Sequence, residues 1–223
     1  MRLAVAMAIA ALFATACNKG PATVDGIRLA QARGVYDPPP AKAKLTVTSD
    51  HIPDDDAVAK VVATVDEGAA IRLIIAMDVP WHEVRRIVDA VIADGRKPVI
   101  LIGKRSHLAA LHLSDKLSGG PAIQLVAQLD GKICLAPPET KTAKCVTRYL
   151  DDHHIDRAFT RGLVDEGVKA YNLHDVELHI PPMMDWADVV RALDGARTCC
   201  GDTEVRVEIL RPDENPRPPG GQP

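Results

Sequence analysis

The 223-residue sequence has few aromatic residues and no long apolar run. Phe, Trp and Tyr make up 3% of the chain, so a hydrophobic core has to be built from Val, Ile, Leu and Ala. Small cores of that kind often need a covalent staple. The apolar run Leu3–Phe13 is shorter than the ~20 residues that cross a bilayer as a helix, so no transmembrane helix is predicted. The net charge of −3 argues against a nucleic-acid-binding protein.

The common catalytic signatures are also missing. G-x-S-x-G, G-x-x-x-x-G-K-[ST] and H-E-x-x-H do not occur, and without C-x-x-C neither a four-thiolate zinc site nor thioredoxin-like chemistry is expected. The densest ligand-like run is "DDHHID", which contains His153 and His154. Acidic side chains there suit the first turn of a helix, so we expect a solvated helix start without metal or cofactor.

The first residues have the pattern of an export signal. Arg2 is followed by the short apolar run and by the small-residue cleavage site "ATA", so residues 1–16 are predicted to be a signal peptide. Cleavage would leave Cys17 first, which resembles a bacterial lipoprotein signal and predicts lipidation of Cys17, with a flexible tether over residues 17–43. Ordinary secretion is the alternative, since "ATA" also satisfies the A-x-A rule. By resemblance to lipoprotein sorting, Asn18 favours the outer over the inner membrane.

Four cysteines remain after Cys17, and an even set in an exported protein predicts disulfides. Cys134 and Cys145 flank the turn-rich stretch "LAPPETKTAK", which a disulfide between them would close. Cys199 and Cys200 are adjacent. A vicinal disulfide, two separate partners and free thiols are all open for this pair.

The chain contains an internal repeat. Shifted by 105 residues, 71–103 aligns without a gap with 176–208, and "WHEVRRIVDA" matches "WADVVRALDG". Upstream, "VDEG" occurs at Val65 and again at Val164, an offset of 99. Two copies of one supersecondary unit explain both matches.

Each repeated segment predicts a helix that begins at a tryptophan. In both, the apolar residues recur at helical spacing and charges fill the opposite face, so Trp81 and Trp186 are interpreted as core anchors. A role as partner hot spots is the alternative for the two tryptophans. Asp185 is a predicted N-cap, and His82 lies on the charged face, where we expect it to be exposed.

Further elements complete two units. Apolar residues at helical spacing follow "DDD" and "DDHHID" and predict one helix after each. "IQLVAQLDGKICLA" predicts a β-hairpin with an Asp-Gly turn. "VDGIRLA" at Val24 is interpreted as the remnant of a matching hairpin. We therefore expect an α+β fold of two tandem small α/β sandwich units, 44–116 and 121–211, each with helices on one face of a short mixed sheet. Residues 212–223 are a predicted disordered tail.

This order of elements resembles the periplasmic domain of the ExbD/TolR family of biopolymer-transport proteins. "LDGKICL" (Leu129–Leu135) is similar to the family's opening hairpin, and residues 71–103 to its later strand–helix–strand. Asp78 matches the family's acidic position, where the second copy has Met183. The family carries a transmembrane helix with a membrane-buried Asp; the apolar run Leu3–Phe13 contains no acid, so proton coupling is not implied.

The expected function is therefore a non-enzymatic binding or scaffold module, tethered by a lipid anchor in the bacterial periplasm. Its partner would be an envelope protein, such as part of the transport machinery, engaged for example by strand addition to a sheet edge. Since chains of the resembled family pair through these domains, an intramolecular pseudo-dimer is a further possibility. The alternative is a metal-dependent or redox envelope enzyme centred on His153/His154 or Cys199/Cys200.

Overall fold

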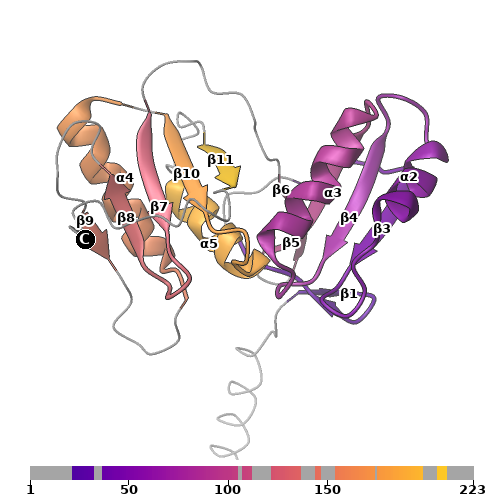
Figure 1. The fold of residues 1–223 in the computed structure, drawn as a ribbon, viewed down its shortest axis with the longest axis horizontal. Helices are drawn as coiled ribbons and strands as arrows, with labels where there is room; N and C mark the ends of the chain where they lie inside the picture. Colours follow the sequence, from indigo (N-terminus) through magenta and orange to yellow (C-terminus); the bar gives the residue numbers. More distant parts are fainter. Residues whose placement is uncertain are drawn as a thin grey trace, which may run out of the picture.

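A computed structural model describes residues 22–32, 37–104, 107–111, 122–136, 144–146, 154–173 and 175–197, and the backbone of 205–209. Over these residues the fold is mixed α/β, which is compatible with the expected α+β class. Four helices and three sheets are present in this part of the chain. Figure 1 shows two sheet-and-helix units side by side, with α3 and α5 in contact at their junction.

The first unit is built on a four-stranded sheet with the order β3-β4-β5-β6. The first three strands are parallel and β6 is antiparallel to β5. Helix α2 connects β3 to β4 and helix α3 connects β4 to β5, and the two helices pack side by side. The elements are β3 (Ala43–Val47), α2 (Asp55–Ala63), β4 (Ala70–Ile75), α3 (Trp81–Ala93), β5 (Lys97–Lys104) and β6 (His107–Leu111).

The alternation of side chains along β4 gives this sheet two apolar faces. Ile71, Leu73 and Ile75 belong to the main core, while Ile74 clusters on the other side with Leu29 and Leu101. Successive residues of a strand point to opposite faces, so a strand with apolar residues on both faces requires cover on both. The helices provide one cover and the N-terminal segment provides the other.

That N-terminal segment is a hairpin of β1 (Thr23–Val24) and β2 (Ile27–Arg28). Asp25 and Gly26 both have positive φ, 51° and 82°, as a two-residue type I′ turn requires. The sequence predicted a flexible tether over residues 17–43, but 22–32 carry this hairpin and the buried Leu29, and β3 begins at Ala43. The predicted tether is therefore too long: its described part belongs to the first unit, because it covers the back of the sheet.

The second unit has a five-stranded sheet with the order β11-β10-β7-β8-β9. β10 is parallel to both β7 and β11, and β7, β8 and β9 are antiparallel neighbours. The turn between β7 and β8 contains Asp130-Gly131, where the sequence predicts a hairpin. The elements are β7 (Ile123–Ala127), β8 (Ile133–Ala136), β9 (Lys144–Val146), α4 (Arg157–Tyr171), β10 (Val176–Ile180), α5 (Trp186–Ala196) and β11 (Val205–Ile209).

The repeat is visible as a shared framework. Both units contain a first strand, a helix, a parallel neighbouring strand, the tryptophan helix and a third parallel strand. These are β3, α2, β4, α3 and β5 in the first unit and β7, α4, β10, α5 and β11 in the second, where β8 and β9 come between β7 and α4. The additions differ, because β6 extends the first sheet beyond β5 while the β8–β9 pair extends the second beyond β7. One hydrophobic cluster contains residues of both units, so their cores are continuous.

Candidate functional site

The junction between the units is built from reciprocal backbone hydrogen bonds. The amide of Trp81 donates to Met184 O (2.8 Å) and that of Trp186 donates to Val79 O (2.9 Å). One residue further, His82 N donates to Pro182 O (3.0 Å) and Ala187 N to Met77 O (2.8 Å). The contacts form equivalent pairs under the repeat offset of 105 residues. Adding 105 to the donor Trp81 and subtracting 105 from the acceptor Met184, for example, gives the contact between Trp186 and Val79.

These contacts satisfy groups that a helix cannot satisfy itself. The first amides of an α-helix have no intrahelical acceptor and are normally capped by a side chain or by water. Neither Pro80 nor Asp185, the two N-cap residues, makes a side-chain cap hydrogen bond. The carbonyl oxygens of the opposite unit take that place, so each tryptophan helix is capped by the other unit.

The two tryptophans meet at the centre of the junction. Both are fully buried, and their rings are stacked with centroids 5.9 Å apart and an interplanar angle of 8°. Each was expected in the core of its own unit; the structure places them in one shared core, against one another. Equivalent residues of two copies meet face to face when the copies are related by a two-fold rotation.

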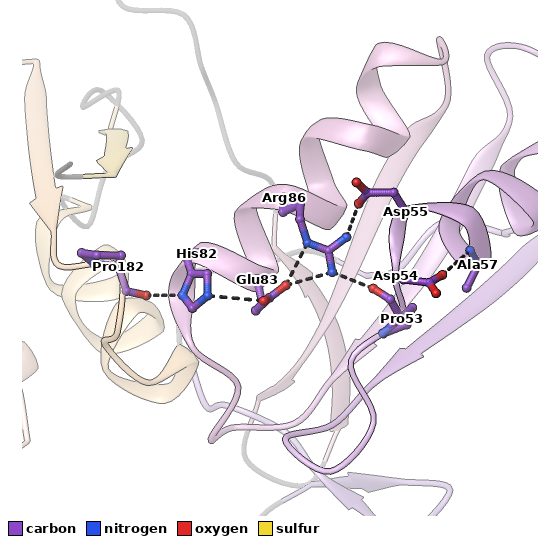
Figure 2. Close-up of polar contacts among 8 residues, drawn as sticks. All are labelled: Pro53, Asp54, Asp55, Ala57, His82, Glu83, Arg86 and Pro182. Atoms are coloured by element: carbon purple, nitrogen blue, oxygen red, sulfur yellow. Dashed lines mark hydrogen bonds and ion pairs between the residues drawn. The ribbon is translucent and has the colours of Figure 1, made fainter. Parts of the chain in front are cut away.

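A chain of polar contacts runs from the junction across the first unit (Figure 2). His82 Nδ1 lies 2.9 Å from Pro182 O, and its Nε2 lies 3.3 Å from Glu83 Oε1. Because a carbonyl oxygen only accepts, Nδ1 carries the proton in the first contact. His82 was expected to be simply exposed; its role at the junction depends on the docking of the second unit.

Arg86 continues this chain to the start of α2. Its guanidinium group pairs with Glu83 (2.8 Å) and Asp55 and donates to Pro53 O (2.6 Å). Burial lowers the pKa of Arg86, but hydrogen bonds and attraction to Glu83 and Asp55 outweigh it, so the pKa is raised. The beginnings of α2 and α3 are therefore joined by one charged side chain.

Asp188, the counterpart of Glu83 in the second unit, joins α5 to the start of α4. Its carboxylate contacts Arg191 (3.1 Å), accepts from Ile155 N (3.2 Å) and lies 3.0 Å from His154 Nδ1. Asp188 is 8% exposed, so these contacts satisfy a mostly buried charge. His154, from the ligand-like run, is thus engaged in joining two helices, while His153 lies outside the described residues.

A cleft of about 220 Å³ opens beside this contact, between the β7–β8 turn and the start of α5. Its rim carries two of the most exposed apolar side chains of the described residues, Leu129 (63%) and Met183 (59%). The lining residues are Gln128, Leu129, Gly131, His154, Met183, Met184, Asp185 and Asp188. The cleft therefore combines an apolar rim with two carboxylates and an imidazole.

The carboxylate of Asp185 has no hydrogen bond or ion pair with any described residue. An N-cap carboxylate usually accepts from the second or third amide of its helix, but here Ala187 N donates to Met77 O and Asp188 N donates to the backbone oxygen of Asp185. Partial burial and the nearby charges of Asp188 and Asp78 raise the pKa of Asp185, against a smaller opposite effect of His154.

The other predicted site residues are not gathered at this cleft. Asp78, the position matched to the ExbD/TolR family, is exposed and accepts a hydrogen bond from Ser49 Oγ (2.8 Å). Cys134 and Cys145 are cross-strand neighbours in β8 and β9 and form a disulfide. Cys17, Cys199 and Cys200, the predicted signal peptide and the tail lie outside the described residues.

The described ranges contain no group of three or more His, Cys, Asp or Glu side chains arranged to hold a metal ion. Their helices are too short or too polar to span a bilayer.

The sequence signals for the cleft were partial. The sequence indicates both the Asp-Gly turn and the N-cap position of Asp185, but Gly131 and Asp185 are 54 residues apart and only the fold brings them together.

Comparison with known proteins finds no relative: no family model, no curated protein and no solved structure matches the chain.

Proposed function

We propose that this protein is a non-enzymatic binding or scaffold module of the bacterial periplasm, held on a membrane through a lipid on Cys17. In this proposal its two units are of ExbD/TolR periplasmic type and form an intramolecular pseudo-dimer. The pair presents one rigid surface to an envelope protein, for which the transport machinery is the leading candidate. Proton coupling is not part of the proposal.

The observation that carries the proposal is the reciprocal capping of the two tryptophan helices. Four backbone hydrogen bonds and the Trp81–Trp186 stack join the units through equivalent residues. Pairing between two chains is what the resembled family implies for such domains, and a tandem duplication supplies it within one chain. A fixed relative position of two units is useful to a protein that acts by presenting a surface.

Two further features support this proposal. A disulfide such as Cys134–Cys145 is typical of proteins in an oxidising compartment such as the periplasm. The His154–Asp188 contact gives His154 a role in joining α4 to α5, which differs from the catalytic or metal-binding role that the alternative function requires.

Association by strand addition would use the edges of the first sheet. Within the described residues β3 and β6 each pair on one side only. β6 is an antiparallel edge strand and carries Leu108, which is 41% exposed. An extended segment of a partner would add to such an edge through backbone hydrogen bonds.

The test is site-specific photo-crosslinking in intact cells that express the full chain. A photoreactive residue at Leu108 is expected to capture one defined envelope protein, and the same residue at the exposed Lys60 on α2 is the matched control. Capture should weaken in Trp186→Ala, which loosens the junction. Equal capture from both positions would overturn the proposal. It would also be overturned if neither position captured a protein and the chain showed a metal-dependent turnover that His154→Ala abolishes.

A further inference from the structure

We propose that the cleft beside the start of α5 receives a lysine or arginine side chain of a partner polypeptide, with an adjacent apolar side chain packed on Leu129 and Met183. This inference rests on the proposed binding function and specifies its partner chemistry.

The shape of the cleft suits one long side chain. Its volume of about 220 Å³ is below the range of about 300–1,000 Å³ typical of pockets for drug-sized ligands. Lysine and arginine carry an apolar stem and a charged head, so they match a site that has an apolar rim and acidic groups within. Leu129 and Met183 lie on one opening, and exposed apolar side chains that gather in this way mark interaction sites.

The cleft is lined by acidic side chains without a compensating Lys or Arg. Its lining includes Asp185 and Asp188 but no Lys or Arg. Asp188 is already engaged by Arg191, His154 and the amide of Ile155, whereas Asp185 has no partner among the described residues. A cation in the cleft would therefore pair with Asp185.

The junction removes one of the amides that would cap Asp185. In an ordinary helix start its carboxylate would accept from the second or third amide, but the amide of Ala187 donates to Met77 O of the other unit, and that of Asp188 donates to Asp185 O. These two contacts leave the carboxylate unpaired at the cleft. Burial and the neighbouring charges of Asp188 and Asp78 raise the pKa of Asp185, and a bound ammonium or guanidinium group would offset those charges.

The first unit does not repeat this chemistry. The positions equivalent to Asp185 and Met183 are Pro80 and Asp78, so the N-cap has no carboxylate and the rim position no thioether. Binding of the proposed kind is therefore expected in the second unit alone.

The test is an NMR titration of the full chain with two short peptides. One is acetyl-Gly-Lys-Leu-Gly-amide and the other has norleucine in place of lysine, which keeps the stem and removes the ammonium group. We expect the lysine peptide to shift the amide signals of Leu129, Met183 and Asp185, with a dissociation constant on the order of 1 mM. The norleucine peptide should bind up to about fivefold more weakly, as loss of one partly exposed ion pair implies.

Variants assign the effect to the cleft. Asp185→Asn should weaken binding of the lysine peptide about fivefold with an otherwise unchanged spectrum. Asp165→Asn, which removes an exposed acid from α4, should leave binding unchanged. Lysine amide alone should bind more weakly than the peptide, because it lacks the apolar neighbour.

Four results would overturn the inference. These are that the lysine peptide causes no shifts, that both peptides bind equally, that Asp185→Asn binds the lysine peptide as tightly as wild type, or that lysine amide binds as tightly as the peptide. Failure of the proposed function is distinguishable. If Asp185→Asn still allows photo-capture from Leu108, the proposed function stands and the cleft plays no part in it. If the lysine peptide binds but nothing is captured from Leu108, the cleft binds as inferred and the proposed function fails.

Discussion

Trp81 and Trp186 occupy the same place in the two copies of the repeat, and their buried rings are stacked on one another. Around them, each unit caps the other's tryptophan helix with its own carbonyl oxygens. In a two-fold interface, residue i contacts j and j contacts i, and here that relation holds within a single chain. The arrangement joins two small cores that contain few aromatic side chains into one larger core.

The Arg86 contacts predict a stability loss on truncation. Arg86→Ala removes the donor to Pro53 O and leaves Glu83 and Asp55 without their cation. We expect the free energy of unfolding to fall by about 1–2 kcal/mol, because charge-assisted hydrogen bonds are lost from a partly buried position. Urea unfolding measures it, with Lys60→Ala on the exposed side of α2 as control, expected within about 0.5 kcal/mol of wild type. Equal stability of both variants would contradict the assigned role.

The disulfide between Cys134 and Cys145 predicts sensitivity to reduction. The bonded residues are 11 apart, and closing a loop of that length stabilises by about 2–3 kcal/mol in the chain-entropy description. Dithiothreitol should lower the urea midpoint accordingly. The double variant Cys134→Ala/Cys145→Ala should start from a lower midpoint and show no further effect of the reductant. A wild-type midpoint that does not change would show that the bond is not formed.

Asp185 predicts a pH-dependent difference between wild type and Asp185→Asn. Burial and the charges of Asp188 and Asp78 raise its pKa in the folded state, so the folded protein holds this proton more tightly than the unfolded chain. Stability is therefore lost as pH rises from the unfolded pKa through the raised folded pKa. Asparagine is an equally good N-cap residue and carries no charge. The variant should be slightly more stable than wild type at pH 7 and equal to it at pH 3. Thermal unfolding at both pH values decides, and a variant that is less stable at pH 7 would contradict the sign.

Lipidation of Cys17 predicts a change of location on substitution. Burial of acyl chains contributes about 0.8 kcal/mol per CH₂, so a multiply acylated cysteine holds a protein on a membrane. Wild type should sediment with membranes and incorporate labelled palmitate, while Cys17→Ser should do neither. Soluble wild-type protein in the periplasmic fraction would instead support ordinary secretion.

The elements of the fold were largely predictable from local patterns. The 3.6-residue spacing around Trp81 and Trp186 indicates both helices, and the Asp130-Gly131 turn indicates the β7–β8 hairpin. The Asp25-Gly26 turn was recognised too, but the hairpin was placed within a tether. The hairpin packs on the apolar back face of the first sheet, which includes Ile74 and Leu101. No local sequence pattern indicates that the N-terminal segment covers this face.

The junction and the cleft were not predictable in this way. A repeat shows which residues are equivalent, but it does not show how two copies dock. The contacts of His82, and the loss of the Ala187 amide as a donor to the Asp185 carboxylate, follow from the docking, since Pro182 O and Met77 O come from the opposite unit. Local reasoning made His82 a surface residue and Asp185 an ordinary cap for that reason.

A double-mutant cycle between the two tryptophans tests the pairing of the units most directly. Trp81→Leu, Trp186→Leu and the double variant are unfolded in urea, and the coupling free energy is taken from the three differences. A stacked aromatic pair predicts a coupling of about 0.5–1.5 kcal/mol. Trp81→Leu combined with Leu135→Ala in β8, at the far side of the second unit from α3 in Figure 1, should be additive within about 0.5 kcal/mol. Additivity of the tryptophan pair itself would contradict the account, since the two units would then fold without this contact.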